Sequence, residues 1–523
     1  MNDFVKMIQE KPELQKYLFV RGFLLTDRYD LKINEYPFMG HWSTKSVGRY
    51  TAYVHEQQKV TTYSCEDKTF FLFGHAYNPF SMEYHEEKVL ERIALSYGTD
   101  DYQGRIDEMT GIFVYGVVGD KGIEYIVDPS GMQSAYYGVV DGNFYLTSHA
   151  QLIGDICDLS MSETAKELTE YKWYYRVMGP YLPGDMSQFD EVKRIVPDIA
   201  YYYSNRVSHR RFYPLRDIKQ CNTEKEYQQV IAEGAKILKN NMELVSKKWT
   251  KPYISLTGGI DSNTTFAAAN GIYDRFKTFS YVSAEKETID ADAAEKISQR
   301  FNVDRILYNI PDTTDELENY DEIVKIIDHN NGYIARGNAN EYRKRVFLIQ
   351  NIDADVEVKS WVSETIRAYW YKHYGRKSMP KLSAKLFRNL YKIFIFNRKL
   401  AHEVDIIFDR YIKEFEYDKI PAQYPPADMH YNEVTWGSWG GLNISEMKIY
   451  TDITIIYNNR KFLDLMFRVP LEKRISDRHH LDMKKILNPE LYDMNIRVVN
   501  MKETAFRAFM LNVIFTLNSI LPF

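Results

Sequence analysis

The stretch KPYISLTGGIDSNTTFAAANGIYD, Lys251 to Asp274, reads as a strand, a glycine turn and a helix. The segment from Tyr253 to Leu256 is short, apolar and partly β-branched, which is typical of a buried strand. The small residues from Thr264 to Ala269 favour a closely packed helix. Gly258 and Gly259 lack Cβ atoms, so the turn can bring its N–H groups close to a ligand.

The turn leads into a helix N-terminus near Ser262, where unpaired N–H groups and the helix dipole favour an anion. The carboxylate of Asp261 would repel phosphate oxygens unless a cation such as Mg²⁺ lies between them. The pattern therefore predicts a Mg-nucleotide site. The binding residues expected there are Ser255, Leu256, Thr257, Gly258, Gly259, Asp261 and Ser262, with Asp261 also a metal ligand. The alternative is an ordinary glycine turn capped by Asp or Ser, since neither Walker A nor G-x-G-x-x-G is present.

Composition excludes several classes of protein. The chain has 523 residues, of which 45% are hydrophobic, so it can bury more than one core. The net charge of −5 gives no general basic surface for nucleic acid.

The run from Tyr371 to Lys399 is locally basic and is either a surface for a negatively charged partner or the solvent-exposed face of helices. Cys65, Cys157 and Cys221 have no C-x-x-C spacing, so neither a disulfide framework nor a zinc site is expected, and a cytoplasmic location fits.

The chain organises into a β-rich first part and an α/β second part. Up to about residue 215, apolar segments alternate with Gly, Asp and Asn turns, as in strand-rich domains. Strands and helices then alternate to about residue 360, which favours a parallel sheet, and the last third is mainly helical. We expect domains at residues 1–215 and 222–523. No segment has the apolar length of a membrane span, and the segment from Ala505 to Phe523 is expected to be a packed terminal helix.

Several motifs, in their order along the chain, resemble the asparagine synthetase family. SLTGGIDS resembles the S-G-G-x-D-S pyrophosphate loop of ATP pyrophosphatases, with Thr257 keeping the first hydroxyl. The segment from Ile106 to Asp155 resembles the glutaminase-type half of that family. VKRIVPDIAYYY resembles its closing strand pair, with Asp198 where glycine is usual. The resemblance implies an α/β protein: an N-terminal Ntn-hydrolase-like αββα sandwich followed by a parallel ATP-pyrophosphatase domain with a helical C-terminal part.

The departures from the family concern glutamine hydrolysis. Working glutaminases of this family use a cysteine directly after the initiator Met as nucleophile, and position 2 here is Asn2. The Asn-Gly that binds the oxyanion is replaced by Phe73-Gly74, which removes an amide donor. The resemblance therefore implies an inactive first domain, as in the branch that resembles β-lactam synthetases and lasso-peptide cyclases.

The family's second nucleotide loop, Ser-Gly-Glu-Gly-Ser-Asp-Glu-x-Phe-Gly-Gly-Tyr, is matched by KSWVSETIRAYWY. Ser363 and Glu364 fall on its Ser-Asp pair, which makes Ser363 a cofactor-binding residue and Glu364 a Mg²⁺ ligand. Trp361 stands where the close approach of backbone is needed, and Arg367 is expected to compensate by pairing a phosphate oxygen. The alternative is a helix start with Glu in its first turn.

Other expectations concern adenine, charge stabilisation and surface residues. By the same resemblance, Tyr281 and Val282 line the adenine site, and Lys502 stabilises negative charge during adenylation and amide formation. The alternative for Lys502 is an ordinary surface lysine. His479, His480, Lys484 and Lys485 are expected at the solvent.

The resulting hypothesis is an ATP-dependent, AMP-forming amide-bond ligase or cyclase that activates a carboxylate as an acyl-adenylate without hydrolysing glutamine. ATP and Mg²⁺ are its expected cofactors. The expected partners are a small-molecule, peptide or sugar carboxylate and an amine, and a homodimer is one candidate assembly. The alternative is a catalytically weakened homologue that binds nucleotide or a partner protein. Pyrophosphatase chemistry on tRNA fits less well with the acidic composition and the family-like first domain.

Overall fold

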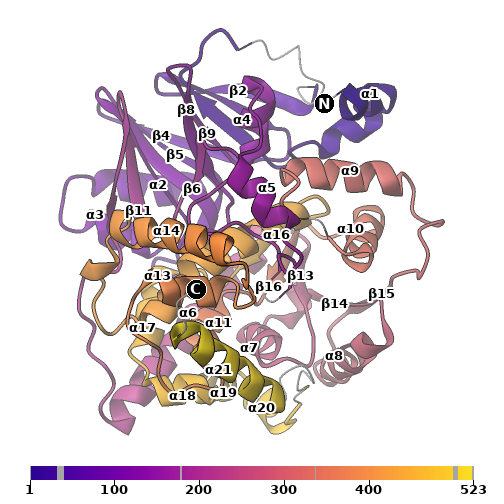
Figure 1. Ribbon diagram of the computed structural model, residues 1–523. Helices are drawn as coiled ribbons and strands as arrows, with labels where there is room; N and C mark the ends of the chain where they lie inside the picture. Colours follow the sequence, from indigo (N-terminus) through magenta and orange to yellow (C-terminus); the bar gives the residue numbers. More distant parts are fainter. Residues whose placement is uncertain are drawn as a thin grey trace.

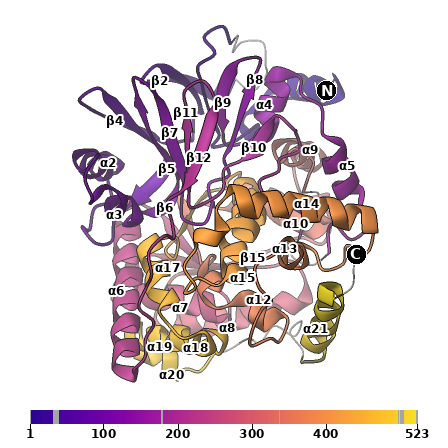
Figure 2. The ribbon, with the colours of Figure 1, turned by 60° about the vertical axis from the view of Figure 1, so that its left-hand side comes forward.

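A computed structural model describes residues 2–31, 40–176, 179–335, 337–496, 498 and 505–520. Their strands form three sheets. Two of the sheets are antiparallel and lie in the upper part of Figures 1 and 2, and the third is parallel and lies below them among most of the helices. The expected mixed α/β class with a parallel sheet is thus confirmed.

The first antiparallel sheet has the strand order β10-β8-β9-β1-β3-β2. Its strands are β1 (Phe23–Thr26), β2 (Trp42–Val47), β3 (Tyr50–His55), β8 (Tyr136–Val140), β9 (Asn143–Thr147) and β10 (Val192–Arg194). The second sheet has the order β12-β11-β7-β6-β5-β4. Its strands are β4 (Val60–Cys65), β5 (Lys68–Tyr77), β6 (Thr110–Gly119), β7 (Gly122–Val127), β11 (Ile199–Tyr203) and β12 (Val207–Arg211).

The two antiparallel sheets pack face to face through aromatic side chains. Phe23 of β1 stacks on Phe73 of β5 with ring centroids 4.2 Å apart, and Phe144 of β9 stacks on Tyr203 of β11 at 4.4 Å. Helix α2 packs on β4 and β5 of the second sheet, and α4 packs on β8, β9 and β10 of the first. The helices of this part are α1 (Asn2–Glu10), α2 (Glu86–Leu95), α3 (Tyr102–Asp107), α4 (Ala150–Cys157) and α5 (Glu163–Glu170), with the 3₁₀ turn η1 (Pro12–Tyr17). The arrangement is a sandwich of two sheets with helices outside each of them.

Helix α6 (Glu224–Lys248) leads into the parallel sheet. It begins directly after its N-cap Thr223, because Thr223 and Glu226 form a capping box that satisfies two N–H groups of the helix start. The parallel sheet has the order β15-β14-β13-β16-β17. Its strands are β13 (Pro252–Ser255), β14 (Lys277–Val282), β15 (Arg305–Asn309), β16 (Val356–Lys359) and β17 (Asp452–Ile455), and every neighbouring pair is parallel.

Helices surround this sheet and fill most of the last third of the chain. Those that connect its first strands are α7 (Ile260–Ala268), α8 (Thr288–Arg300), α9 (Tyr320–Asn330) and α10 (Ala339–Asn351). Between β16 and β17 lie α11 (Ser363–Ile366), α12 (Tyr369–His373), α13 (Ala384–Tyr391), α14 (Arg398–Glu414), α15 (Pro426–His430), the π-helix η7 (Tyr431–Gly440) and α16 (Gly441–Met447). After β17 come α17 (Arg460–Phe467), α18 (Leu471–Ile475), α19 (Arg478–Leu487), α20 (Pro489–Asp493) and α21 (Ala505–Ile520). Short 3₁₀ turns are η4 (Tyr273–Arg275), η5 (Glu285–Glu287) and η6 (Tyr417–Lys419).

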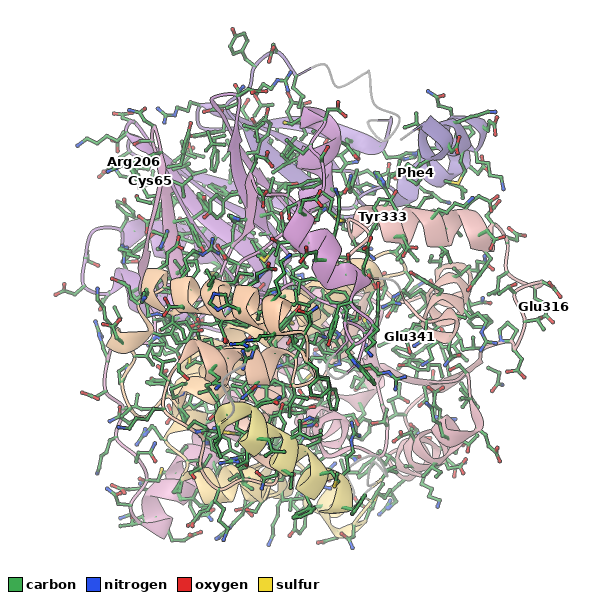
Figure 3. The ribbon with its side chains drawn as sticks, in the orientation of Figure 1. Phe4, Cys65, Arg206, Glu316, Tyr333 and Glu341 are labelled. Carbon is green, nitrogen blue, oxygen red and sulfur yellow. The ribbon has the colours of Figure 1, made fainter. Side chains whose placement is uncertain are left out.

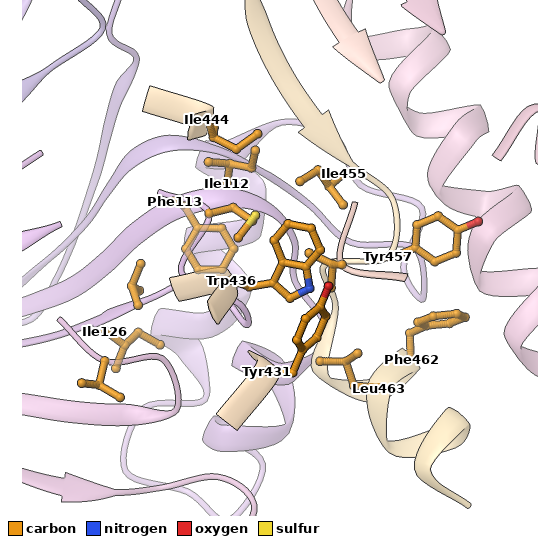
Figure 4. Close-up of a cluster of buried hydrophobic side chains, with 14 of the residues drawn as sticks. Ile112, Phe113, Ile126, Tyr431, Trp436, Ile444, Ile455, Tyr457, Phe462 and Leu463 are labelled. Carbon is orange, nitrogen blue, oxygen red and sulfur yellow. The ribbon is translucent and has the colours of Figure 1, made fainter. Parts of the chain in front are cut away.

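The β-rich part and the parallel part share one hydrophobic core. Figure 4 shows Ile112 and Phe113 of β6 beside Trp436 of η7, with Ile455 and Tyr457 close by. Because such cores exclude water over a continuous surface, the two parts are held together as one body.

Buried ion pairs also cross between the two parts. Arg211 of β12 donates two hydrogen bonds to Glu433 of η7, at 2.7 and 3.0 Å, and neither side chain is exposed. Arg460 of α17 pairs with Asp198 at 2.8 Å. The expected boundary between residues 215 and 222 falls in the connection from β12 to α6, and it stays a prediction.

Candidate active site

The glycine turn lies between β13 and α7, at the carboxyl edge of the parallel sheet. Gly259 is the N-cap of α7, and its N–H donates to the Thr257 hydroxyl at 3.1 Å. The hydroxyls of Thr257 and Ser262 lie 2.8 Å apart, and the N–H of Thr257 donates to Ser262 Oγ at 3.2 Å. The two hydroxyls therefore hold the turn in shape from both ends.

Gly258 occupies a position that no side chain could fill. An added Cβ would lie 2.1 Å from Cγ2 of Val498, and the N–H of Val498 donates to Gly258 O at 3.1 Å. The N–H of Gly258 donates to Asp290 Oδ1, in the first turn of α8, at 2.9 Å. A carboxylate oxygen thus occupies the position in which a phosphate oxygen would accept this hydrogen bond.

Asp261, in the first turn of α7, is the hub of a polar cluster. Ser363 Oγ donates to Asp261 Oδ1 at 2.6 Å, and Arg367 forms an ion pair with Oδ2. His480 Nε2 lies 3.5 Å from Oδ1. The structure therefore brings together Asp261, Ser363 and Arg367, three residues that were singled out from two separate sequence motifs.

Arg367 bridges Asp261 to a second carboxylate, Asp477. It donates to Asp477 through Nε at 2.8 Å and Nη2 at 3.0 Å, and Lys372 Nζ donates to the same carboxylate at 2.7 Å. Burial would raise the pKa of Asp477, but its bonds with Arg367 and Lys372 hold that pKa well below its usual range. Burial also opposes the charge of Arg367, yet Asp261 and then Asp477 keep its pKa above the ordinary value. Both groups are therefore charged in the folded protein.

Glu364 lies in the same cluster as Asp261. Burial, followed by the negative charge of Asp261, raises the pKa of Glu364 to about 7. Its Oε2 is buried and makes no hydrogen bond to the described residues. Two carboxylates that repel each other, one with an unsatisfied oxygen, form a donor set that a divalent cation would neutralise. Mg²⁺ fits this arrangement, since one or two carboxylates together with phosphate oxygens are its common ligands.

Within the described ranges, no group of three or more His, Cys, Asp or Glu side chains is arranged to hold a metal ion. A cation at Asp261 and Glu364 would therefore take its remaining ligands from substrate phosphates and water. The metal assignment stays a prediction.

In the loop from Lys359 to Tyr371, two residues that fall on glycines of the resembling family have left-handed backbone. Val362 falls on the glycine before Ser-Asp and has φ +75°, and Ala368 falls on the first of the two later glycines and has φ +51°. A branched residue in this region is strained, so the surrounding structure must impose the conformation. Trp361 packs its ring against Trp436 and Trp439, with centroids 5.4 and 5.5 Å away.

The other predicted residues fall into two groups. Ser255, Leu256, Tyr281 and Val282 lie at the carboxyl ends of β13 and β14, where Leu256 N donates to Phe279 O and the strands pair in parallel. Lys344 Nζ lies 4.7 Å from the centre of the Tyr281 ring. Lys502 lies outside the described residues, and its predicted role is untested.

Sequence reasoning missed several members of the cluster. Asp290 and Asp477 carried no motif, and His480 was expected at the solvent but is fully buried, as is His479. Burial, followed for His480 by the positive charge of Arg367, lowers the pKa of both imidazoles well below the usual value. Lys484 was also expected at the solvent and is buried, because α19 packs against α6 and α7. In the sequence around Asp477, the adjacent pair His479 and His480 was the feature that pointed to this part of the cluster.

The region that resembles a glutaminase holds no cysteine at the head of its first strand. β1 follows Arg21 and Gly22, while Asn2 lies at the start of α1, well before the sheet. The side chain of Phe73 stacks in the sandwich core on Phe23 and offers no donor for an oxyanion. Cys65 lies at the end of β4, at the edge of the β-rich part in Figure 3.

Comparisons with known proteins address the segment that contains the glycine turn. Residues 252–342 match the family model described as asparagine synthase. The match runs from β13 into α10 and includes the turn, Asp290 and the end of β14, and it indicates ATP-dependent ligase chemistry of the asparagine synthetase type. A search of curated proteins gave no match.

The similar solved structures include three with low identity. One is the glutamine phosphoribosylpyrophosphate amidotransferase from B. subtilis complexed with ADP and GMP, with 8% identity, 70% of this chain and 74% of that chain covered, and a TM-score of 0.22. A glutamine-dependent NAD⁺ synthetase from Acinetobacter baumannii in complex with ADP has 11% identity, coverages of 36% and 38%, and a TM-score of 0.17. An allosteric regulatory enzyme of purine biosynthesis has 9% identity, coverages of 66% and 90%, and a TM-score of 0.25.

Across the part of the chain that the structure describes, no helix combines the length and the apolar character needed to cross a membrane. The cytoplasmic location and the homodimer stay predictions.

Proposed function

We propose that this chain is an ATP-dependent amide-bond ligase or cyclase that activates a substrate carboxylate as an acyl-adenylate and takes its amine from a source other than glutamine. The observation that carries the proposal is the cluster at the carboxyl edge of the parallel sheet. There the glycine turn meets Asp261, Ser363, Glu364 and Arg367, within and beside the segment that matches the asparagine synthase model. Ligands of open α/β sheets bind at this edge.

In the proposed reaction, a carboxylate oxygen of the substrate attacks the α-phosphorus of ATP. An O–P bond forms, the bond from the α-phosphorus to the bridging oxygen breaks, and pyrophosphate leaves. The amine nitrogen then attacks the acyl carbon, AMP leaves and the nitrogen loses a proton. The turn at Gly258 and Gly259 would bind the departing phosphates when its N–H groups exchange Asp290 Oδ1 and Thr257 Oγ1 for phosphate oxygens, and Arg367 would pair a phosphate oxygen. Asp261 and Glu364 would hold Mg²⁺, which supplies charge neutralisation for the phosphates.

The absence of glutamine hydrolysis is part of the proposal. Arg21 and Gly22 precede β1, and burial raises the pKa of both the Cys157 and the Cys221 thiols, which disfavours the reactive thiolate. Phe73 is committed to the sandwich core. An external amine or an amine within the substrate is therefore the proposed nitrogen source.

The experiment measures ATP-dependent release of pyrophosphate and AMP with panels of carboxylic acids and amines. Asp261→Asn should abolish turnover, and circular dichroism checks that this variant is folded, whereas Asp274→Asn, at an exposed site in η4, should leave turnover unchanged. Ammonium or a substrate amine should support the reaction. AMP release by the Asp261 variant at the rate of the unmodified protein, or glutamate release from glutamine, would contradict the proposal.

A second candidate function is that of a catalytically weakened relative that binds nucleotide or a partner. Two contacts favour it: Asp290 already accepts the N–H of Gly258, and Arg367 already neutralises Asp261. Calorimetry with ATP separates the two functions. The weakened relative is favoured if the protein binds ATP but releases pyrophosphate with none of the acids. In that case Glu364→Gln and Arg367→Ala should bind ATP as tightly as the unmodified protein does.

A further inference from the structure

Helix α21 contacts the body of the protein through one face, which carries two asparagines and a phenylalanine. Asn512 accepts a hydrogen bond from Arg376 at 2.7 Å, and Asn518 donates to Ile393 O at 2.7 Å. Between them Phe515 is fully buried, with its ring 4.6 Å from that of Tyr374. These contacts attach one face of the helix to the segment that contains α12 and α13.

The opposite face of α21 is apolar and exposed. Its large side chains are between 38% and 73% exposed: Phe506, Phe509, Met510, Val513, Leu517 and Ile520. Their spacing of three and four residues places them in one stripe along the helix. The expected packed terminal helix is therefore packed on one side only, and Figures 1 and 2 show it at the surface. A row of six large apolar side chains on the outward face of a surface helix forms a contiguous apolar patch, and such patches mark interaction surfaces.

The chain segments that include α12, α13 and α21 contain basic residues and no acidic ones. Residues 365–402 and 505–520 contain no Asp or Glu. Of the ten Arg and Lys residues in the first segment, Arg388 and Lys392 are buried, and Arg367 and Lys372 pair with Asp477. Lys377 and Lys381, in the connection from α12 to α13, are exposed. Both of these helices contact α21. The exposed apolar stripe is thus bordered by a basic rim.

We propose that the stripe of α21 and the adjacent basic rim dock on an anionic membrane surface, with the helix lying in the plane of the interface. Phe, Leu and Ile enter the boundary between headgroups and acyl chains, and the lysines contact anionic headgroups. A second copy of this chain fits the surface less well, because a two-fold interface through α21 would bring two basic rims together. This inference does not depend on the ligase reaction.

The test is flotation of the full chain with vesicles of phosphatidylcholine alone or mixed with phosphatidylserine. The unmodified protein should float with the mixed vesicles and remain largely unbound with phosphatidylcholine alone. Phe509→Ser and Leu517→Ser should each weaken binding by roughly tenfold or more, because each removes an apolar side chain from the interface. Ile289→Ser is the matched control: Ile289 is 54% exposed on α8 and should not affect binding.

A pair of charge reversals tests the basic rim. Lys377→Glu with Lys381→Glu should abolish the preference for phosphatidylserine, and Lys236→Glu with Lys239→Glu, on the exposed face of α6, should leave it unchanged. In Figure 2, α6 and α21 lie on opposite sides of the molecule. The proposal is overturned if the protein binds both vesicle types equally or binds neither. It is also overturned if the protein binds no vesicles but self-associates in sedimentation and Phe509→Ser removes that self-association.

Discussion

Replacing Glu364 by glutamine is expected to change how the stability of the protein depends on pH. Burial, followed by the charge of Asp261, raises the pKa of Glu364 from its ordinary value of 4.5 to about 7. The folded protein therefore binds this proton more tightly than the unfolded chain does. The associated stability is fully present below the unfolded pKa and is lost as the pH rises through the folded one.

The magnitude follows from the separation of the two pKa values. One pH unit corresponds to about 1.4 kcal/mol, so the rise from 4.5 to about 7 is worth about 3.4 kcal/mol in total. Between about pH 5 and about pH 8, roughly 2.5 kcal/mol of this is lost. Glu364→Gln cannot titrate, so its stability relative to the unmodified protein should rise by that amount over this range. The cost of an unpaired buried amide does not depend on pH and cancels in the comparison.

Urea denaturation without divalent cations, repeated across this pH range, measures the effect. Glu233→Gln, at an exposed site on α6, is the matched control and should follow the unmodified protein. A stability difference between Glu364→Gln and the unmodified protein that stays constant with pH would refute the reasoning. Added Mg²⁺ should stabilise the unmodified protein at about pH 8, where Glu364 is ionised, and should not stabilise Glu364→Gln.

Two further predictions concern the loops. Asp290→Ala frees the N–H of Gly258 and removes a negative charge. Calorimetry should therefore show that this variant binds pyrophosphate roughly tenfold more tightly. Asp292→Ala, at an exposed position on the same helix, is the control and should leave this affinity unchanged. Equal affinity in both variants would show that Asp290 does not compete with phosphate. Ala368→Gly should leave the free energy of unfolding unchanged or raise it by up to about 1 kcal/mol, because glycine relieves the left-handed φ of +51°. Ala294 is buried within α8, so Ala294→Gly should lower the free energy of unfolding by about 1 kcal/mol or more. If urea denaturation shows a similar decrease for both variants, the backbone at Ala368 is not strained.

The amino-acid sequence by itself determined the local units of this protein. The apolar segment before Gly258 predicts β13, and the small residues after Ser262 predict α7. Alternation of strands and helices predicts the parallel sheet, because that pattern depends on local periodicity alone. The first loop was identified for the same reason, because its hydroxyls, glycines and acid are contiguous in the chain, whereas the second was identified by its resemblance to a family motif.

Only the tertiary structure decided which distant groups meet at these loops. Asp290 reaches Gly258, and Asp477 reaches Arg367, through helix packing that no local pattern encodes. Asp198, Val362 and Ala368 adopt left-handed backbone where the resembling family has glycine, because surrounding contacts override local preference. Likewise, α19 packs inward and buries His480, whereas α21 packs on one face only, since the exposure of a side chain depends on what covers its helix.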